Sequence, residues 1–381
     1  MKTPDIFKDI RPFEPEELPE VYDRLLADKQ FQAVVAYLYP NVPMEAIGAK
    51  MRQCRTNLDF QKAFCYGFLE DLLSKASTGC DMDIEKVDVQ RRYTFVSNHR
   101  DIVLDSALLD KLLIDAKFST TCEIAIGDNL LSLPWVKDLV RVNKSFIVER
   151  SLPPRQMLMA SKRLSEYMHY AIAGKNENVW IAQREGRAKD SDDRTQPAIL
   201  KMMAMGGEGT PAERLSQLHI VPLAISYEYD PCDYLKAAEL QQRRDNPHFS
   251  KAPGDDVVSM RTGIMGYKGR IHYHCAECID SYLATVAGMP KSEFFDAVAA
   301  HIDKEIHRHY MLFASNYVAL DLLEGNGQYR SRYTDAEKNT FVGYIERQMA
   351  KISIPNPDSN FLRRTMLTMY ANPVRNQIAA L

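Results

Sequence analysis

A histidine and two aspartates follow a short apolar run in the segment FVSNHRDIVLD, residues 95–105. His99 comes directly after the run, and Asp101 and Asp105 follow it by two and six residues. An imidazole can take a proton from a hydroxyl near neutral pH. A neighbouring carboxylate can fix the imidazole tautomer and stabilise the imidazolium that forms. The segment therefore predicts a general base with an orienting carboxylate.

The elements around the segment indicate which carboxylate faces the imidazole. Residues 92–97 have the composition of a strand, and residues 102–116 have the apolar spacing of a helix. Helical side chains lean toward the amino end of their helix, so Asp105, one turn in, points back at the strand. Asp101 stands where a helix N-cap is expected. We favour Asp105 as the partner of His99, with Asp101 as the alternative.

Short β-branched runs alternate with amphipathic segments from residue 91 onward. Strands are expected at 92–97, 122–126, 145–149, 178–183, 219–228 and 269–277, and helices at 102–116 and 153–174. This order predicts an α/β fold with a mixed, largely parallel sheet flanked by helices. Pro222 inside 219–228 suggests an edge strand or a bulge.

Polar side chains that suit an anionic ligand stand at the ends of two further strands. Arg150 follows 145–149, and Glu185, Gly186 and Arg187 follow 178–183. The carboxyl ends of parallel strands share one edge of a sheet, where ligands bind. Arginine suits bidentate contact with phosphate, and glycine lets the backbone approach a ligand closely. We expect these residues at the same edge of the sheet as His99.

The ordered motifs NHRDIVLD, SFIVER, EGR followed by QPAILKM, and IVPLAISYE resemble those of the glycerol-phosphate and lysophosphatidate acyltransferase superfamily. The resemblance covers roughly residues 90–275. His99 and Asp105 match the family's His-x4-Asp box with one additional residue, which we expect in the loop or in a tight first helical turn. The EGR motif lacks the residue that the family has between glycine and arginine.

The resemblance implies acyl transfer from a thioester to the hydroxyl of a glycerol-3-phosphate or lysophosphatidate acceptor. His99 is then the general base and Asp105 its orienting partner. The expected substrate-binding residues are Arg100, Arg150, Glu185, Gly186 and Arg187. No cofactor or metal is expected, because acyl-CoA or acyl carrier protein brings an already activated acyl group. Acylation of a non-phosphate acceptor, such as an amino-acid lipid, and a non-catalytic lipid- or carrier-protein-binding module are the alternatives.

The rest of the chain is expected to be helical. We divide the 381 residues into a helical N-terminal region (1–88), an α/β acyltransferase domain (89–285) and a helical C-terminal region (286–381). Polar residues 77–89 suggest the first boundary. Residues 130–140, with the sequence LLSLPWVKDLV, suit ordinary packing somewhat better than contact with an acyl chain or a membrane surface.

Composition and charge limit the partners. The net charge of −3 gives no basic field for nucleic acid, so nucleic acid is not an expected partner. Seven scattered cysteines suit a reducing compartment, and neither a signal peptide nor a long apolar run is visible. We expect a cytoplasmic protein, or a peripheral one on the inner membrane surface. The HYHCAEC segment, residues 272–278, favours a structural role over a zinc site.

Overall fold

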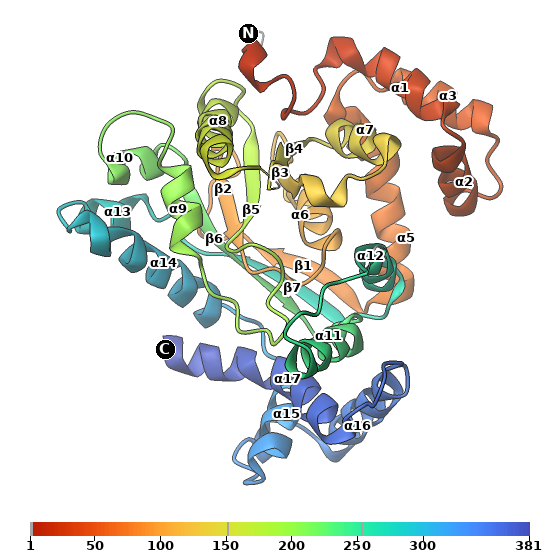
Figure 1. Cartoon of the computed structure of the whole chain (residues 1–381), viewed down its shortest axis with the longest axis vertical. Helices are drawn as coiled ribbons and strands as arrows, with labels where there is room; N and C mark the ends of the chain where they lie inside the picture. The colour runs from red at the N-terminus through yellow and green to blue at the C-terminus, as the bar shows by residue number, and fades with distance from the viewer. Residues whose placement is uncertain (1–2, 151, 253) are drawn as a thin grey trace.

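A mixed seven-stranded sheet forms the centre of the computed structural model, which describes residues 3–150, 152–252 and 254–381 (Figure 1). The strand order is β1-β7-β6-β2-β5-β3-β4, and every neighbouring pair is parallel except β6 with β7. The predicted fold class, a largely parallel sheet flanked by helices, is confirmed.

The strands are β1 (Gly79–Asp83), β2 (Thr94–Ser97), β3 (Cys122–Gly127), β4 (Ser145–Val148), β5 (Asn178–Ala182), β6 (Ile220–Tyr227) and β7 (Arg270–Cys275). The helices before and among them are α1 (Leu18–Ala27), α2 (Lys29–Leu38), α3 (Met44–Gln53), α4 (Asn57–Phe60), α5 (Tyr66–Ala76), α6 (Leu104–Asp115), α7 (Pro134–Val142), α8 (Pro154–Ala173), α9 (Pro197–Met203), α10 (Pro211–Ser216), α11 (Asp233–Asp245) and α12 (Asp255–Met265). The helices after them are α13 (Asp280–Val286), α14 (Lys291–Arg308), α15 (Ala314–Glu324), α16 (Asp335–Met349) and α17 (Ser359–Ala380).

Alternating side chains of the strands bury both faces of the sheet. Phe95, Trp180 and Val221 pack on the face that α5 and α6 cover. Val96 and Ile181 pack on the other face, with α8, α9 and α14. This two-sided burial explains why the central strands are almost continuously apolar in sequence.

The chain outside the sheet forms two further apolar clusters. Helices α1 to α3 pack around Leu18, Tyr22 and Met51 near α7. Helices α15 to α17 pack with α11 around Val318, Phe341, Met366 and Tyr370, at the opposite end of the molecule (Figure 1). The three-region division stays a prediction, although its two terminal regions are mainly helical as expected.

Pro222 lies in an interior strand, so the edge or bulge suggested by the sequence is wrong. β6 lies between β2 and β7. The β6–β7 ladder begins at Leu223 opposite Cys275, and the Pro222 carbonyl accepts one last bond from the Ala276 N–H at 2.9 Å. The missing proline N–H therefore falls at the end of the ladder, where its loss interrupts no further pair.

Residues 77–89, polar in sequence and expected at a boundary, and residues 241–259, whose polar composition predicts a loop, both contain regular structure. Residues 77–89 include β1, an edge strand whose Asp81 pairs with His272 of β7 at 2.6 Å. Residues 241–259 include the end of α11 and the start of α12. The polar Gln241 of α11 is buried because its amide hydrogen-bonds to Asn356 and Asp358 of the C-terminal region. Tertiary partners, which the sequence pattern does not display, stabilise both segments.

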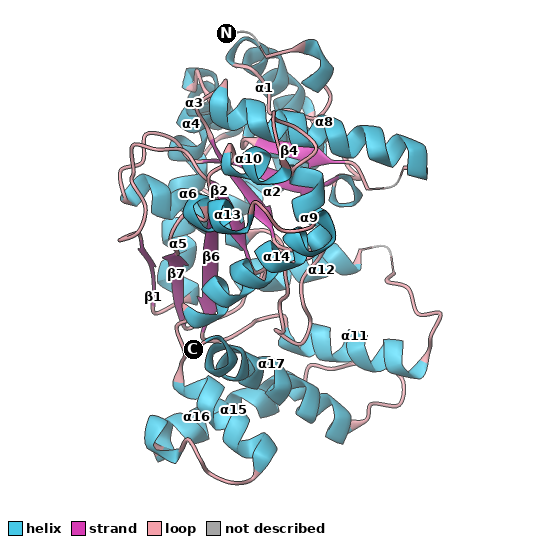
Figure 2. Ribbon diagram, turned by 90° about the vertical axis from the view of Figure 1, so that its left-hand side faces the viewer, coloured by secondary structure: helices cyan, strands magenta, loops and turns pink. Residues whose placement is uncertain are grey.

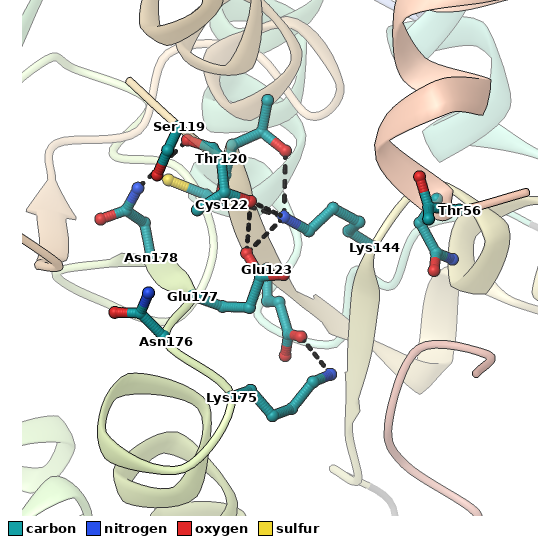
Figure 3. Close-up of polar contacts among 12 residues, drawn as sticks. Thr56, Ser119, Thr120, Cys122, Glu123, Lys144, Lys175, Asn176, Glu177 and Asn178 are labelled. Carbon is teal, nitrogen blue, oxygen red and sulfur yellow. Dashed lines mark hydrogen bonds and ion pairs between the residues drawn. The ribbon is translucent and has the colours of Figure 1, made fainter. Parts of the chain in front are cut away.

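A buried polar network ties the amino ends of β3, β4 and β5 together (Figure 3). The Lys144 ammonium, just before β4, donates to Glu177 at 2.7 Å, to the Thr120 hydroxyl at 2.8 Å and to the Thr121 carbonyl at 3.1 Å. Glu123 at the start of β3 is paired with Lys175. Because these charges are buried, their pairing offsets the cost of removing them from water. The network fixes the strand register at the edge opposite the strand ends discussed next.

Among the described residues, no helix has the length and apolar character needed to cross a bilayer.

Candidate active site

The carboxyl ends of β2, β5, β3 and β4 lie at one edge of the sheet, and the loops that follow them carry the predicted polar residues. All four strands run parallel. His99 follows β2, Arg150 follows β4, and Glu185 to Arg187 follow β5. The expectation that these motifs share one edge therefore holds. This edge is the usual ligand-binding side of an open α/β sheet.

The His99 imidazole is held by Asp105. Its Nδ1 lies 2.8 Å from Asp105 Oδ2, and the histidine side chain keeps 14% of its surface exposed. The same carboxylate oxygen accepts from the backbone N–H groups of Arg100 at 2.6 Å and Asp101 at 3.1 Å. Three donors therefore fix a fully buried carboxylate. With Nδ1 in this bond, Nε2 is the ring nitrogen that can meet a substrate hydroxyl.

The additional residue between His99 and Asp105 is accommodated in the loop. Helix α6 begins at Leu104, two residues later than the sequence suggested, so Asp105 stands in its first turn. Residues 102–103 form a turn that bends the chain from β2 into the helix. The side chain consequently points back to His99, as the direction of helical side chains requires.

Asp101, the alternative partner of His99, instead accepts hydrogen bonds at the start of α6, where the sequence also suggested a helix cap. Its Oδ1 accepts from the N–H groups of Val103 at 2.9 Å and Leu104 at 2.8 Å, which lead into α6. Burial and the nearby Asp105 charge raise the pKa of Asp101. Its Oδ2 lies against Gly263 of α12, where an added Cβ would approach to 1.8 Å. Asp101 thus fixes the helix start and the seat of α12.

Two residues that the sequence analysis did not single out hold the loop in place. The Asn98 amide donates to the Ile225 carbonyl at 2.9 Å and accepts from the Ile225 N–H at 2.8 Å, joining the end of β2 to β6. The Trp180 ring lies edge-on to the His99 ring with centroids 5.8 Å apart, and its indole N–H donates to Ser97 at 3.0 Å. Trp180 therefore limits the rotation of the imidazole from the neighbouring strand.

Arg100, an expected substrate-binding residue, is buried and has a protein partner. Its Nη1 lies 3.3 Å from Asp193 Oδ2, and its guanidinium lies 5.7 Å from the Tyr310 ring centroid. Asp193 also faces the His99 N–H at 3.5 Å, and its carbonyl oxygen lies 2.9 Å from His307 Nε2. Through these contacts Arg100 supports the loop that carries His99, and its expected contact with substrate stays a prediction.

Arg150 reaches across the strand end of β3 toward β5. The β4 strand is three positions away from β2, about 14 Å at ordinary strand spacing. The Arg150 guanidinium lies against Gly127 at the end of β3, where a Cβ added to the glycine would be 2.9 Å from Arg150 Nε. Nη1 lies 3.7 Å from Glu185 Oε1. Because Gly127 has no side chain, Arg150 can extend across the end of β3 and approach Glu185 after β5. The residues around Gly127 in the sequence do not indicate this role.

The Arg187 guanidinium lies near the buried carboxylate of Asp230. Its charge contributes to lowering the pKa of Asp230, together with the ion pair of Asp230 with Lys236. One of its terminal nitrogens is buried and has no hydrogen-bond partner among the described residues. Gly186 before it has a φ of +65°, a conformation that favours glycine. The turn and the unsatisfied guanidinium nitrogen leave Arg187 with binding capacity for an anion.

Comparison with known proteins identifies one part of the chain. Residues 81–226 match the family model described as Acyltransferase. The chain carries an acyltransferase-family domain. The crystal structure of the 1-acyl-sn-glycerophosphate (LPA) acyltransferase PlsC from Thermotoga maritima is similar at 12% identity, with a TM-score of 0.36 over 75% of this chain and 95% of that one. No curated protein matches the sequence.

The matched part of the acyltransferase domain contains every predicted site residue, from His99 to Arg187. The resemblance noted in the sequence is therefore confirmed at the level of the acyltransferase family. Helices α1 to α5 and the chain from α11 onward lie outside the match. The individual roles of the site residues stay predictions.

The histidines and cysteines of the HYHCAEC segment have different partners in the structure. His272 and His274 face Asp81 and Asp83 of β1 at 2.6 Å and 3.3 Å. Cys278 instead joins His219 and Asp280 in a group that could hold a metal ion. Burial raises the pKa of the Cys278 thiol to about 12, and the Arg91 guanidinium lies 3.9 Å from Asp280. The nearby Arg91 cation pairs with the Asp280 carboxylate and supports the expected structural role of this group.

Proposed function

We propose that the protein transfers a fatty acyl group from a thioester to a hydroxyl of glycerol-3-phosphate or lysophosphatidate. The observation that carries the proposal is the His99–Asp105 contact at 2.8 Å, on the ligand-binding edge of an acyltransferase domain. The thioester is acyl-CoA or acyl carrier protein. No metal is required, because the thioester carbonyl is already activated.

The chemistry follows from the orientation of the imidazole. His99 Nε2 removes the proton from the acceptor hydroxyl while the oxygen attacks the thioester carbonyl. Asp105 holds the Nδ1 proton in place and stabilises the imidazolium. When the tetrahedral intermediate collapses, the carbon–sulfur bond breaks and the imidazolium returns the proton to the leaving thiolate. The products are an ester and a free thiol, so all atoms and charges balance.

The proposed transfer is tested with radiolabelled donors and a panel of acceptors. Acyl-CoA and acyl carrier protein thioesters are each offered with glycerol-3-phosphate, lysophosphatidate and a hydroxyl-bearing amino-acid lipid. Labelled phospholipid from either phosphate acceptor supports the proposal. A product from the amino-acid lipid alone would favour the non-phosphate alternative. Donor binding without transfer to any acceptor would favour a non-catalytic binding module.

Arg150 and Arg187 are proposed to bind the acceptor phosphate. Each Arg→Ala variant should raise the apparent KM for the phosphate acceptor about 10- to 150-fold, because a hydrogen bond to a charged group is worth about 1.5–3 kcal/mol. The KM for the donor should change little. Initial rates over an acceptor series measure both constants, and Arg52→Ala, at an exposed position paired with Asp23, is the control. Unchanged acceptor saturation in both variants would place the phosphate elsewhere.

We also propose that the site edge faces the lipid surface that holds the substrate. Leu158 and Met159 of α8 are 63% and 68% exposed, and Val257 and Val258 of α12 are 65% and 51% exposed. Helix α8 follows β4 at the active-site edge, and Gly263 of α12 packs on Asp101. The amino ends of both helices lie on the same side of the molecule, at the right in Figure 2.

Removing these apolar side chains should weaken vesicle binding. Serine at both Leu158 and Met159, or at both Val257 and Val258, should reduce cosedimentation with phosphatidylcholine–phosphatidylglycerol vesicles roughly 10-fold or more, at about 1.5 kcal/mol or more for each buried aliphatic side chain. Ile378→Ser, which changes an exposed apolar residue of α17, is the control. Equal cosedimentation of all variants would contradict this orientation.

A further inference from the structure

Asp193, in the irregular segment 191–196 between β5 and α9, contacts two residues of the loop that carries the imidazole. Its fully buried carboxylate faces the His99 backbone N–H through Oδ1 at 3.5 Å, and Oδ2 lies 3.3 Å from Arg100 Nη1. Arg100 in turn donates its backbone N–H to Asp105 at 2.6 Å. One side chain therefore connects to His99 and, through Arg100, to the carboxylate that orients the imidazole.

The ion pair makes the position of the loop depend on the position of segment 191–196. The Asp193 and Arg100 side chains are both buried. Burial raises the pKa of Asp193, and the charge of Arg100 acts against that rise. A buried charge that loses its partner is costly, so the two groups are expected to move together. A displacement of the segment would therefore displace the loop that carries His99.

Helix α14 holds the segment on one side. Asp303 Oδ1 accepts from the Thr195 backbone N–H and from the Thr195 hydroxyl, both at 2.7 Å. Four residues later on the same helix face, the buried His307 has its Nε2 2.9 Å from the Asp193 carbonyl oxygen. Burial lowers the pKa of His307 to about 4, so the ring is neutral at physiological pH and Nε2 carries the proton of this hydrogen bond.

Helix α17 holds the same segment and the residue before it. The Asn376 amide donates to Asp192 at 3.1 Å and accepts from Arg194 Nη2 at 3.0 Å. One turn earlier, the Asn372 amide donates to the Asp190 carbonyl at 2.9 Å. Helices α14 and α17 also pack against each other (Figure 1). The segment is therefore attached to a packed pair of C-terminal helices.

We propose that the helical C-terminal region positions the catalytic histidine, and that Asp193 is the positioning residue that connects α14 and α17 to the loop of His99. The inference rests on the proposed function, in which His99 is the general base. It gives a role in the reaction to α14 and α17, which lie outside the matched residues 81–226.

The test releases the segment at residues remote from the imidazole. Asp303→Ala with Asn376→Ala removes a contact from each helix and should reduce kcat about 10- to 100-fold, because a small displacement of a catalytic group has an effect of this size. The KM values for donor and acceptor should stay near those of the wild type, since the expected substrate-binding residues are retained. Initial rates over series of both substrates measure these constants. Asp296→Ala with Asn339→Ala, at exposed positions of α14 and α16, is the matched control.

Amide hydrogen exchange measures the position of the loop without turnover. A peptide covering residues 95–105 should exchange roughly 10-fold faster in the test variant than in the control variant, because the loop opens more often when its support is released. A peptide covering β3 should exchange at the same rate in both variants. Thermal denaturation confirms that both proteins fold.

A second variant, Asp193→Asn, covers the case in which the double variant does not fold. The amide has nearly the same shape as the carboxylate, and its loss of charge removes the ion pair with Arg100. It should show the same decrease in kcat and the same faster exchange of residues 95–105.

The outcomes separate this inference from the proposed function. Control-level kcat and exchange in the folded variants would overturn the inference while leaving acyl transfer intact. A raised KM with unchanged kcat would also overturn it, because the contacts would then serve substrate binding. Faster exchange of residues 95–105 in the variants, with no acyl transfer by the wild-type protein, would support the connection to the C-terminal helices and contradict the proposed function.

Discussion

Replacing His99 with alanine should lower the rate of acyl transfer by about 10²- to 10⁴-fold, the usual contribution of a general base. The imidazole is the group that can accept the acceptor proton through Nε2, since Nδ1 is bonded to Asp105 at 2.8 Å. Without it, the hydroxyl must attack the thioester while still protonated. The decrease should appear in kcat, because donor and acceptor contacts from other residues are retained.

The fold should tolerate this change. His99 lies in the loop after β2 and does not belong to the apolar clusters on the two faces of the sheet. Thermal denaturation should therefore show a cooperative transition close to that of the wild type. His248→Ala, at an exposed loop position, controls for the loss of an unrelated imidazole. Wild-type turnover in a folded His99→Ala protein would remove the proposed mechanism.

The strands that carry the site could be predicted because each is locally apolar and ends in a polar segment. β2, β4 and β5 were expected at 92–97, 145–149 and 178–183 and are observed within those limits. Their parallel order then places the ends on one edge. The partner of His99 followed from the direction of helical side chains, since Asp105 stands in the first turn of α6.

The contacts that support the site depend on residues far apart in the chain. Asp193 pairs with Arg100 across 93 positions, and Trp180 packs against His99 from the neighbouring strand. The family resemblance implied a substrate contact for Arg100, which stays a prediction, whereas the contact of its guanidinium with Asp193 at 3.3 Å was not visible in the sequence. Gly127 matters only because the Arg150 side chain crosses it. No local pattern encodes these contacts, which arise when the sheet brings the segments together.

An apolar cavity of about 310 Å³ between the N-terminal helices and α6 could not be predicted for the same reason. Its walls combine helices near the N-terminus with α6 and α7 of the acyltransferase domain. Each helix shows an ordinary apolar stripe in sequence, which is equally typical of a filled core. Only the packing of the stripes leaves space between them, so the sequence could indicate apolar faces and could not indicate a vacant volume.

Asp105→Asn and Asp101→Asn should differ sharply in activity. Asp105→Asn should reduce kcat by roughly 10²- to 10⁴-fold, because a neutral amide cannot stabilise the imidazolium and can favour the wrong tautomer of His99. Asp101→Asn should retain most of the rate, since asparagine accepts from the first N–H groups of a helix about as well as aspartate does. Initial rates at saturating donor and acceptor measure the difference.

The contacts of the two carboxylates explain this asymmetry. Asp105 Oδ2 accepts from the His99 ring and from two backbone N–H groups, whereas Asp101 Oδ1 accepts only from backbone N–H groups. In Asp105→Asn the amide oxygen must take the place of Oδ2. Its NH₂ group then occupies the position of Oδ1, which is buried without a hydrogen-bond partner among the described residues. A cost of about 1–3 kcal/mol in stability is expected from that unpaired donor.

This stability cost must be separated from the loss of catalysis. Asp105→Asn should therefore be assayed well below its melting temperature, with the folded fraction measured by circular dichroism at the assay temperature. If Asp101→Asn is the inactive variant, Asp101 has the role that we give to Asp105, and the acyltransferase assignment is unaffected. If folded Asp105→Asn turns over at the wild-type rate, the carboxylate only shapes the loop. His99 would then act without an orienting partner, and general-base catalysis would lose its main structural support.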